Sequence, residues 1–357
     1  MNQKKLYFFI SIIFLANHIF SQDIPFSNTN ANAVYLNPAS TGVINRDVRI
    51  GTIYRSQGKS VANPYNTMGF NADLAFYPNR DKSNFIGVGV YGYKHEEGIA
   101  KYRQTIFNIS VSYTKGLSST MTDFLTLGFQ GGISQRAMNI NGLRWDSQWD
   151  GTRNSFNETF LGEYYDTKNK DVYDMAAGAL YNKKISRNLK FNAGVAVHHV
   201  FAPSISMNSS PYGPNKVAND PDFLHRKFTL HGAAEISTTD NSTIILVPAF
   251  IYSQKMSQKL LMFGMDLKFL KGNDSKFTDY MKQTAISFGL SYRWGDAIIP
   301  HARIDYKDFS FFLAYDVTVS KLNAANKSNG AFEFAFVWNF KTGMSSKNKP
   351  RVFKFIQ

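Results

Sequence analysis

Residues 331–340, AFEFAFVWNF, alternate between two kinds of side chain along their whole length. One set is entirely aromatic, and the other consists of alanine, valine, one glutamate and one asparagine. Only a β-strand places successive residues on opposite faces, because its side chains have a period of two. The stretch therefore predicts a strand with one strongly apolar face and one small or polar face.

Other stretches repeat this pattern. Residues 105–114, 259–269 and 285–294 set large apolar side chains against a face rich in Gly, Ser, Asn and charged residues. Weaker alternation predicts strands over residues 48–56, 65–77, 84–94, 123–136, 172–183, 189–201, 225–237, 243–254, 297–306 and 309–320. The range 243–254 fits least well, because residues 244–247 do not alternate and Pro248 removes a ladder donor. The total is about fourteen strands.

The composition indicates where such strands reside. Aromatic residues make up 15% of the chain, with 31 Phe and 19 Tyr, whereas charged residues make up only 18%. An apolar outer band with aromatic girdles needs this balance, and a crowded or water-lined lumen suits the small polar face. A soluble β-sandwich is the alternative, but it would have shorter strands and a more charged exposed face. We therefore predict an all-β fold, a transmembrane antiparallel β-barrel.

The N-terminus predicts export. Lys4 and Lys5 precede the apolar run 6–16, and a small residue, Ser21, stands where a signal peptidase would cut. The run is shorter than the roughly 20 residues that a membrane-spanning helix needs. With a bilayer as the destination, only a closed barrel satisfies the backbone hydrogen bonds of strands.

Four segments follow from these patterns. Residues 1–21 form the signal peptide, residues 22–47 a luminal or periplasmic segment, residues 48–340 the barrel, and residues 341–357 a basic periplasmic tail. An even number of strands places both ends of the barrel in the periplasm. The two longest connections, around 137–171 and 202–224, then lie outside the cell.

The net charge of +14 does not indicate a nucleic-acid partner. Much of the excess lies in the predicted signal peptide and in the acid-free tail, and the remaining basic residues are scattered rather than gathered into a stripe. We expect outer-membrane lipid, and no nucleic acid, around this chain.

The sequence offers no enzyme motif, and we expect no catalytic residues and no cofactor. The absence of cysteine excludes disulfides, thiolate metal sites and a lipid-anchored Cys. His198 and His199 are adjacent on a predicted strand, so they are expected to point to opposite faces and not to chelate one metal. Residues 146–151 copy half of a calcium loop, but position 157 is Asn where the bidentate acid belongs, so a solvated loop tip is expected and no metal.

Charged residues on the inner face of the later strands have mixed signs, unlike the single sign of an ion-selective pore. Mixed signs favour ion pairs that hold a plug and tie strands together, with a substrate path as the alternative. The predicted inner charges are Lys227, His231, Glu235, Asp266, Lys268, Arg293, Arg303, Asp305, Asp316 and Glu333.

Two motifs resemble a known family. Residues 36–39, LNPA, with Gly42, and residues 315–322, YDVTVSKL, followed by residues 330–333, GAFE, are similar to the signatures of the PorP/SprF family of type IX secretion system membrane proteins. The signature positions are Leu36, Asn37, Pro38, Ala39, Gly42, Tyr315, Asp316, Ser320, Leu322, Gly330, Phe332 and Glu333.

The resemblance implies a Bacteroidetes outer-membrane barrel of about fourteen strands, related to the FadL-like fatty-acid transporter fold. It implies a non-enzymatic role in type IX secretion and gliding motility, with a cargo protein bearing a C-terminal sorting domain, the translocon and periplasmic ring proteins as partners. A passive transporter of a hydrophobic small molecule remains the alternative. Candidate partner-binding residues in the long outer loops are Trp145, Gln148, Trp149, Tyr164, Tyr165 and Tyr212.

Overall fold

The computed structural model describes residues 24, 26–28, 31–60, 63–77, 84–119, 122–139, 144, 148–157, 169–206, 223–237, 243–271 and 284–342. The predicted signal peptide and nearly all of the predicted tail lie outside these residues and stay predictions.

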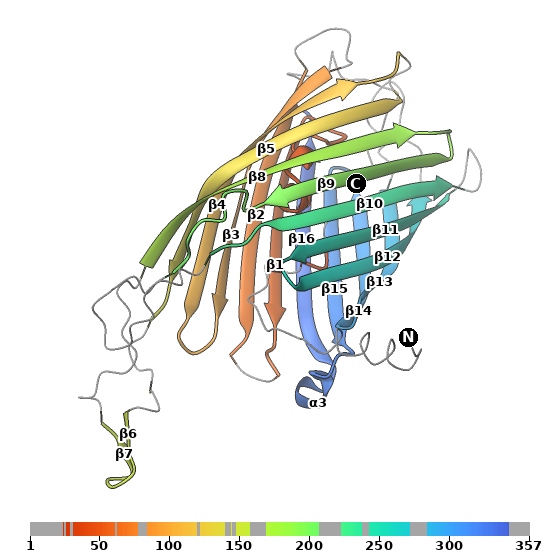
Figure 1. Cartoon of the computed structure of the whole chain (residues 1–357). Coiled ribbons are helices and arrows are strands. Elements are labelled where there is room, and N and C mark those ends of the chain that lie inside the picture. The colour runs from red at the N-terminus through yellow and green to blue at the C-terminus, as the bar shows by residue number, and fades with distance from the viewer. Residues whose placement is uncertain are drawn as a thin grey trace, which may run out of the picture.

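Within the described residues, fourteen antiparallel strands form a closed barrel, which confirms the predicted fold (Figure 1). The first half contains β1 (Val48–Gln57), β2 (Tyr65–Phe76), β3 (Asn84–Glu97), β4 (Tyr102–Gly116), β5 (Asp123–Ala137), β8 (Asn169–Lys184) and β9 (Leu189–His198). The second half contains β10 (Lys227–Ser237), β11 (Ile244–Lys255), β12 (Gln258–Lys271), β13 (Thr284–Arg293), β14 (Ala297–Tyr306), β15 (Phe309–Thr318) and β16 (Asn329–Phe340).

Five short elements lie outside the wall. They are α2 (Ala33–Leu36), η1 (Pro38–Ser40), α3 (Asn323–Asn326), and the strands β6 (Trp149–Asp150) and β7 (Ser155–Phe156), which pair only with each other. No described helix is long and apolar enough to cross a bilayer.

Neighbouring strands in the sequence pair along the wall, with β5 and β8 adjacent across the β6–β7 insertion. The barrel closes where β1 meets β16, with Val48 opposite Phe340 and Gln57 opposite Ala331. This closure leaves the barrel sheet without an open edge, as lipid requires. We call the end at which β1 begins and β16 ends the base, and the opposite end the mouth. The long connections after β5 and β9 both leave from the mouth.

The doubtful strand around Pro248 is present as β11. Its pairing with β12 is continuous, whereas its pairing with β10 is interrupted at Val247 and Pro248. Because proline has no N–H to donate, the gap in the ladder occurs at this residue.

The prediction that His198 and His199 point to opposite faces is wrong. β9 ends at His198, and His199 has a φ of +58°, so the backbone leaves the strand before the alternation continues. His198 Nε2 lies 3.2 Å from the carbonyl oxygen of Leu36, and His199 Nδ1 lies 2.6 Å from the Asp174 carboxylate. Both imidazoles are therefore buried within the barrel.

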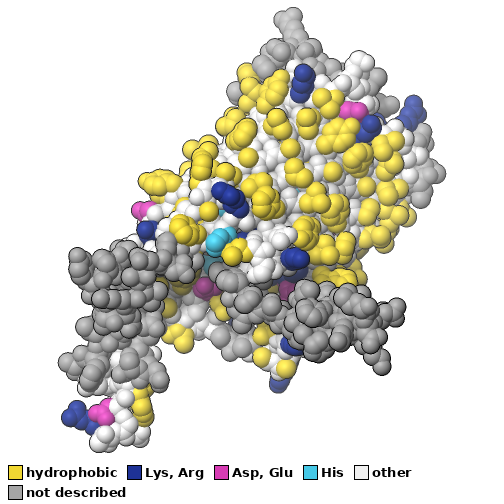
Figure 2. Space-filling model, in the orientation of Figure 1, with side chains coloured by type: hydrophobic (Ala, Val, Ile, Leu, Met, Phe, Trp, Pro, Cys, Tyr) yellow, Lys and Arg dark blue, Asp and Glu magenta, His cyan; other side chains and the backbone are white. Residues whose placement is uncertain are grey.

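The outer wall is covered by the apolar faces of the strands (Figure 2). On β4, for example, Phe107, Ile109, Val111 and Tyr113 are exposed, whereas the alternate residues from Asn108 onward are buried. This arrangement inverts that of a soluble protein and matches a wall in contact with lipid.

We expect Ile109→Arg to lower the free energy of unfolding in lipid vesicles by about 2–4 kcal/mol, because its side chain faces outward at the middle of β4. Ile99→Arg, in the turn after β3, is expected to cost less than about 1 kcal/mol, although Ile99 is the more exposed side chain at 79% against 53%. Urea titration of vesicle-refolded protein measures both. Equal costs would contradict a lipid-facing wall.

Candidate functional site

The described part of the segment before β1 lies inside the barrel, and we call residues 24–47 the plug. At the mouth side, Ile24, Phe26 and Val34 pack against wall residues that include Tyr91 and Phe312. Toward the base, the plug continues with Ala39, Val43 and Ile44, which share an apolar cluster with wall residues of β2, β3 and β5. The chain therefore passes through the lumen from the mouth to the base before it enters the wall.

Asn37 anchors the middle of the plug. Its Nδ2 donates to the carbonyl oxygens of Ala179, at 3.0 Å, and Val195, at 3.3 Å. Its Oδ1 accepts from the N–H of Ala39 at 2.9 Å, which caps η1. The residue is fully buried, so these bonds supply the partners that a buried amide needs.

A glycine in the wall makes room for η1. A Cβ added at Gly128 would lie 2.4 Å from the backbone nitrogen of Ala39. Such a contact is far below ordinary van der Waals separation, so any larger residue would push the plug away from β5.

An ion pair fastens the plug near the base. Arg49 Nε donates to Asp73 Oδ1 at 2.8 Å, and Arg49 Nη2 donates to the carbonyl oxygen of Ser40 at 3.2 Å. The second oxygen of Asp73 accepts from the N–H of Gly42 at 2.7 Å. Gly42 has a φ of +70°, a conformation that favours glycine.

A second cluster holds the plug near the mouth, and we call Ser27, Arg55, Arg293, Asp316 and Glu333 the latch. The carboxylate of Glu333 accepts from the backbone N–H groups of Ser27, at 2.9 Å, and Asn28, at 2.6 Å. Two oxygens of one buried side chain thus bind two successive amides of the plug.

The arginines of the latch bridge its two acids. Arg55 donates to Asp316 at 2.8 Å and to Glu333 at 3.1 Å, and Arg293 donates to Asp316 at 3.0 Å. Both guanidinium groups also donate to the Ser27 hydroxyl, which itself donates to Asp316 at 2.7 Å. Four charges of balanced sign therefore converge on one serine of the plug, where low solvent access strengthens each bond.

Other predicted inner charges also form pairs within the described lumen. Asp266 lies 2.6 Å from His301, Arg303 donates to Asp305 at 2.7 Å, and Glu235 accepts from Lys190 at 2.7 Å. The first contact joins β12 to β14 and the third joins β9 to β10, whereas Arg303 and Asp305 pair along β14. The described lumen is therefore not lined by charges of one sign.

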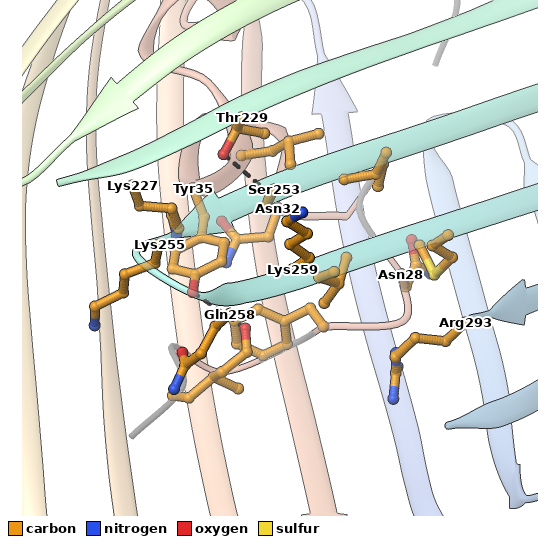
Figure 3. A pocket seen from close by; sticks show the side chains of 16 residues that line it. Asn28, Asn32, Tyr35, Lys227, Thr229, Ser253, Lys255, Gln258, Lys259 and Arg293 are labelled. Atoms are coloured by element: carbon orange, nitrogen blue, oxygen red, sulfur yellow. Dashed lines mark hydrogen bonds between the residues drawn. The ribbon is translucent and has the colours of Figure 1, made fainter. Parts of the chain in front are cut away.

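A cavity of about 90 Å³ opens at the mouth between the plug and the inner wall of β10–β13 (Figure 3). Ile24, Phe26, Asn28, Asn32, Tyr35 and Leu36 of the plug line one side. The other side consists of Lys227, Thr229, Ile251, Ser253, Lys255, Gln258, Lys259, Leu260, Met262 and Arg293.

The predicted signature residues divide between the lumen and the wall. Asn37, Pro38, Ala39 and Gly42 lie in the plug, and Asp316 and Glu333 belong to the latch. Leu36 packs against an apolar cluster whose residues come from β11, β12, β14 and β15. The remaining signature residues lie on the outer wall or near its mouth, namely Tyr315, Ser320, Leu322, Gly330 and Phe332.

Of the candidate partner-binding residues, Gln148 and Trp149 are described. Trp149 belongs to the β6–β7 hairpin, is 45% exposed and contacts Phe156 with ring centroids 4.9 Å apart. Trp145, Tyr164, Tyr165 and Tyr212 lie outside the described residues.

The described part of the half calcium loop forms a turn around Asp150. Asp150 Oδ1 accepts from the N–H groups of Thr152, at 2.9 Å, and Arg153, at 3.3 Å. Among the described residues, no three His, Asp or Glu side chains are placed to hold a metal ion.

Sequence reasoning missed Arg49, Arg55 and Asp73, which complete the two charged clusters. They occupy the small, polar face of the first two strands, where their alternation with Ile50, Thr52 and Leu74 was the available signal.

The family description "Type IX secretion system membrane protein PorP/SprF" matches residues 19–338. No curated protein matches the chain. Among solved structures, the CymD monoaromatic hydrocarbon channel is 9% identical, with 88% of this chain and 94% of that chain covered and a TM-score of 0.48.

Two other structures show the same general likeness. A Pseudomonas aeruginosa FadL homologue is 10% identical, with 87% of this chain and 94% of that chain covered and a TM-score of 0.43. BamA from Haemophilus ducreyi is 8% identical, with 82% of this chain and 70% of that chain covered and a TM-score of 0.38. At these identities the likeness concerns the fold alone.

Proposed function

Because this chain belongs to the PorP/SprF family of type IX secretion system membrane proteins, we propose that it binds the C-terminal sorting domain of a secreted or surface protein at the mouth of its barrel. The chain is an outer-membrane component of that system. In this proposal the base contacts periplasmic ring proteins, and no step of the role is catalytic.

The observation that carries the proposal is the occupied lumen. Charged wall residues bind the backbone of the plug near both the mouth and the base, so the described plug and wall leave no open route for a protein chain. A secretion component of this form acts through its ends, where connections project from the wall. The β6–β7 hairpin, with an exposed tryptophan, projects away from the barrel at the mouth (Figure 1).

Trp149→Ala tests the mouth as a docking surface. We expect it to weaken binding of a purified sorting domain at least about tenfold, because tryptophan is enriched among the residues that contribute most of the binding energy at protein interfaces. Trp294→Ala is the matched control, since Trp294 is exposed at 68% in another connection at the mouth. Affinity is measured on the detergent-solubilised barrel, and export is measured as surface display in cells that carry each variant.

An equal loss of affinity in Trp149→Ala and Trp294→Ala would show that the β6–β7 hairpin is not the specific docking surface. Normal display of every surface protein in a strain that lacks the gene would overturn the proposed function.

Passive transport of a hydrophobic small molecule is the second candidate, and a series of cavities favours it. The cavity at the mouth shares Ile251 and Met262 with a second cavity, which shares Ala249 and Phe250 with a third beside Arg49. Together the three lie between the plug and the wall, mainly along β8–β15. Loss of radiolabelled dodecanoate uptake in the deletion strain, with surface proteins intact, would favour transport over secretion.

A further inference from the structure

Asn32 is an unsatisfied polar group in the wall of the cavity at the mouth. Its side chain is 2% exposed, and neither its Nδ2 nor its Oδ1 has a hydrogen-bond partner among the described residues. An unpaired buried amide costs roughly 1–3 kcal/mol for each group. Gln258 Nε2 and Arg293 Nε in the same lining also lack partners.

The charge of the lining has one sign. Lys227, Lys255 and Lys259 line the cavity, and none of the described lining residues is acidic. Arg293 also lines it, but its charge is balanced by Asp316 of the latch. The Lys227 ammonium lies 5.2 Å from the centre of the Tyr35 ring, which places a cation directly beside apolar surface. Such a lining attracts a ligand that carries a carboxylate next to an apolar group.

We propose that this cavity binds an extended, acidic peptide segment of the secreted partner, with a peptide group paired to Asn32. The inference rests on the proposed function and names the chemistry of the segment that the mouth recognises. The apolar side chain of the segment packs between Phe26 and Met262, and its neighbouring carboxylate meets Lys227 and Lys255.

The amide of Asn32 distinguishes a peptide from a lipid anion. Its oxygen needs a donor and its nitrogen needs an acceptor, and a peptide group supplies an N–H and a C=O together. A fatty-acid carboxylate supplies acceptors only. Neighbouring side chains cover the Asn32 amide, so binding of the peptide includes the turning aside of flexible side chains in the cavity lining (Figure 3).

Photo-crosslinking of the full-length barrel in lipid nanodiscs tests this proposal. The probe is acetyl-Gly-photoleucine-Glu-Gly-amide, and its charge twin carries Lys in place of Glu. We expect the acidic probe to label cavity residues, identified by mass spectrometry, at least about fivefold more than its twin. Lys255→Glu and Asn32→Ala should each reduce that labelling by a similar factor.

Lys321→Glu is the matched control, because Lys321 is exposed in the β15–β16 connection at the same end and does not line the cavity. Heat-dependent electrophoretic mobility confirms that each variant is folded. Equal labelling by both peptides, labelling outside the cavity, or labelling of the cavity only by a diazirine-bearing dodecanoate would each overturn the proposal.

The same variants separate this inference from the proposed function. If the sorting domain binds wild-type protein and Lys255→Glu equally well, the cavity is not the peptide-binding site, whereas the proposed role in secretion is unaffected. If the sorting domain does not bind the wild-type barrel at all, the proposed function itself fails.

Discussion

Arg55→Ala is expected to release the mouth side of the plug from the barrel wall. Arg55 is 2% exposed and bridges Asp316 and Glu333, so its loss leaves two buried carboxylates with less compensating charge. Breaking a buried ion pair in this way costs about 3–5 kcal/mol. The same two carboxylates bind Ser27 and the adjacent amide of the plug. The lost free energy therefore weakens the attachment of the plug to the wall.

A reporter cysteine measures the release. The chain has no cysteine, and Val34 in α2 is fully buried and close to cysteine in size, so Val34→Cys provides a single thiol. We expect Arg55→Ala to raise the rate at which a water-soluble maleimide labels this thiol by about 100-fold or more.

Arg103→Ala provides the control for this prediction. Arg103 also pairs with a carboxylate, that of Glu96, but it is exposed at the mouth, where an ion pair contributes less than about 1 kcal/mol. Labelling rates that are the same for wild type, Arg55→Ala and Arg103→Ala would contradict the role given to the latch.

Gly128→Ala is expected to displace the middle of the plug. The added methyl group would lie 2.4 Å from the backbone of Pro38 and Ala39, and backbone cannot turn aside as a side chain does. Overpacking of this kind costs about 1–3 kcal/mol, so we expect about tenfold faster labelling of Val34→Cys.

Gly131→Ala is the matched control, three residues along the same strand. Its added methyl group would meet Met175 Cγ at 3.7 Å, an ordinary contact on the outer wall. No change in labelling is expected there. A similar increase in labelling rate for both substitutions would indicate a general weakening of β5 rather than a specific close contact between Gly128 and η1.

The strands could be predicted from the sequence because their two faces meet different environments. A wall between lipid and a packed lumen imposes a period of two on every strand, as in residues 331–340. This pattern can be recognised in each strand without knowledge of the strands that pair with it. The sequence predicts even the strand that forms β11, although Pro248 interrupts its ladder to β10.

The plug and the latch could be predicted only in part. Asp316 and Glu333 were visible as inner charges, but their partner Arg55 precedes them by 261 and 278 residues. Only closure of the barrel brings β1 beside β16, and no local pattern reports that contact. The plug has no periodicity, because its side chains contact the wall on several sides.

The error at His198 and His199 has a local cause. Alternation holds only while the backbone stays extended, and His199 adopts a positive φ where β9 ends. A histidine pair beside a strand end gives no sequence signal for that change of backbone direction.

Ion conductance across a planar lipid bilayer tests whether the plug closes the lumen. We expect the wild-type barrel to carry no steady current, whereas a variant that lacks residues 24–46 opens a pore with stable current steps. If the wild-type barrel conducts as well as the deletion variant, the plug does not close the lumen.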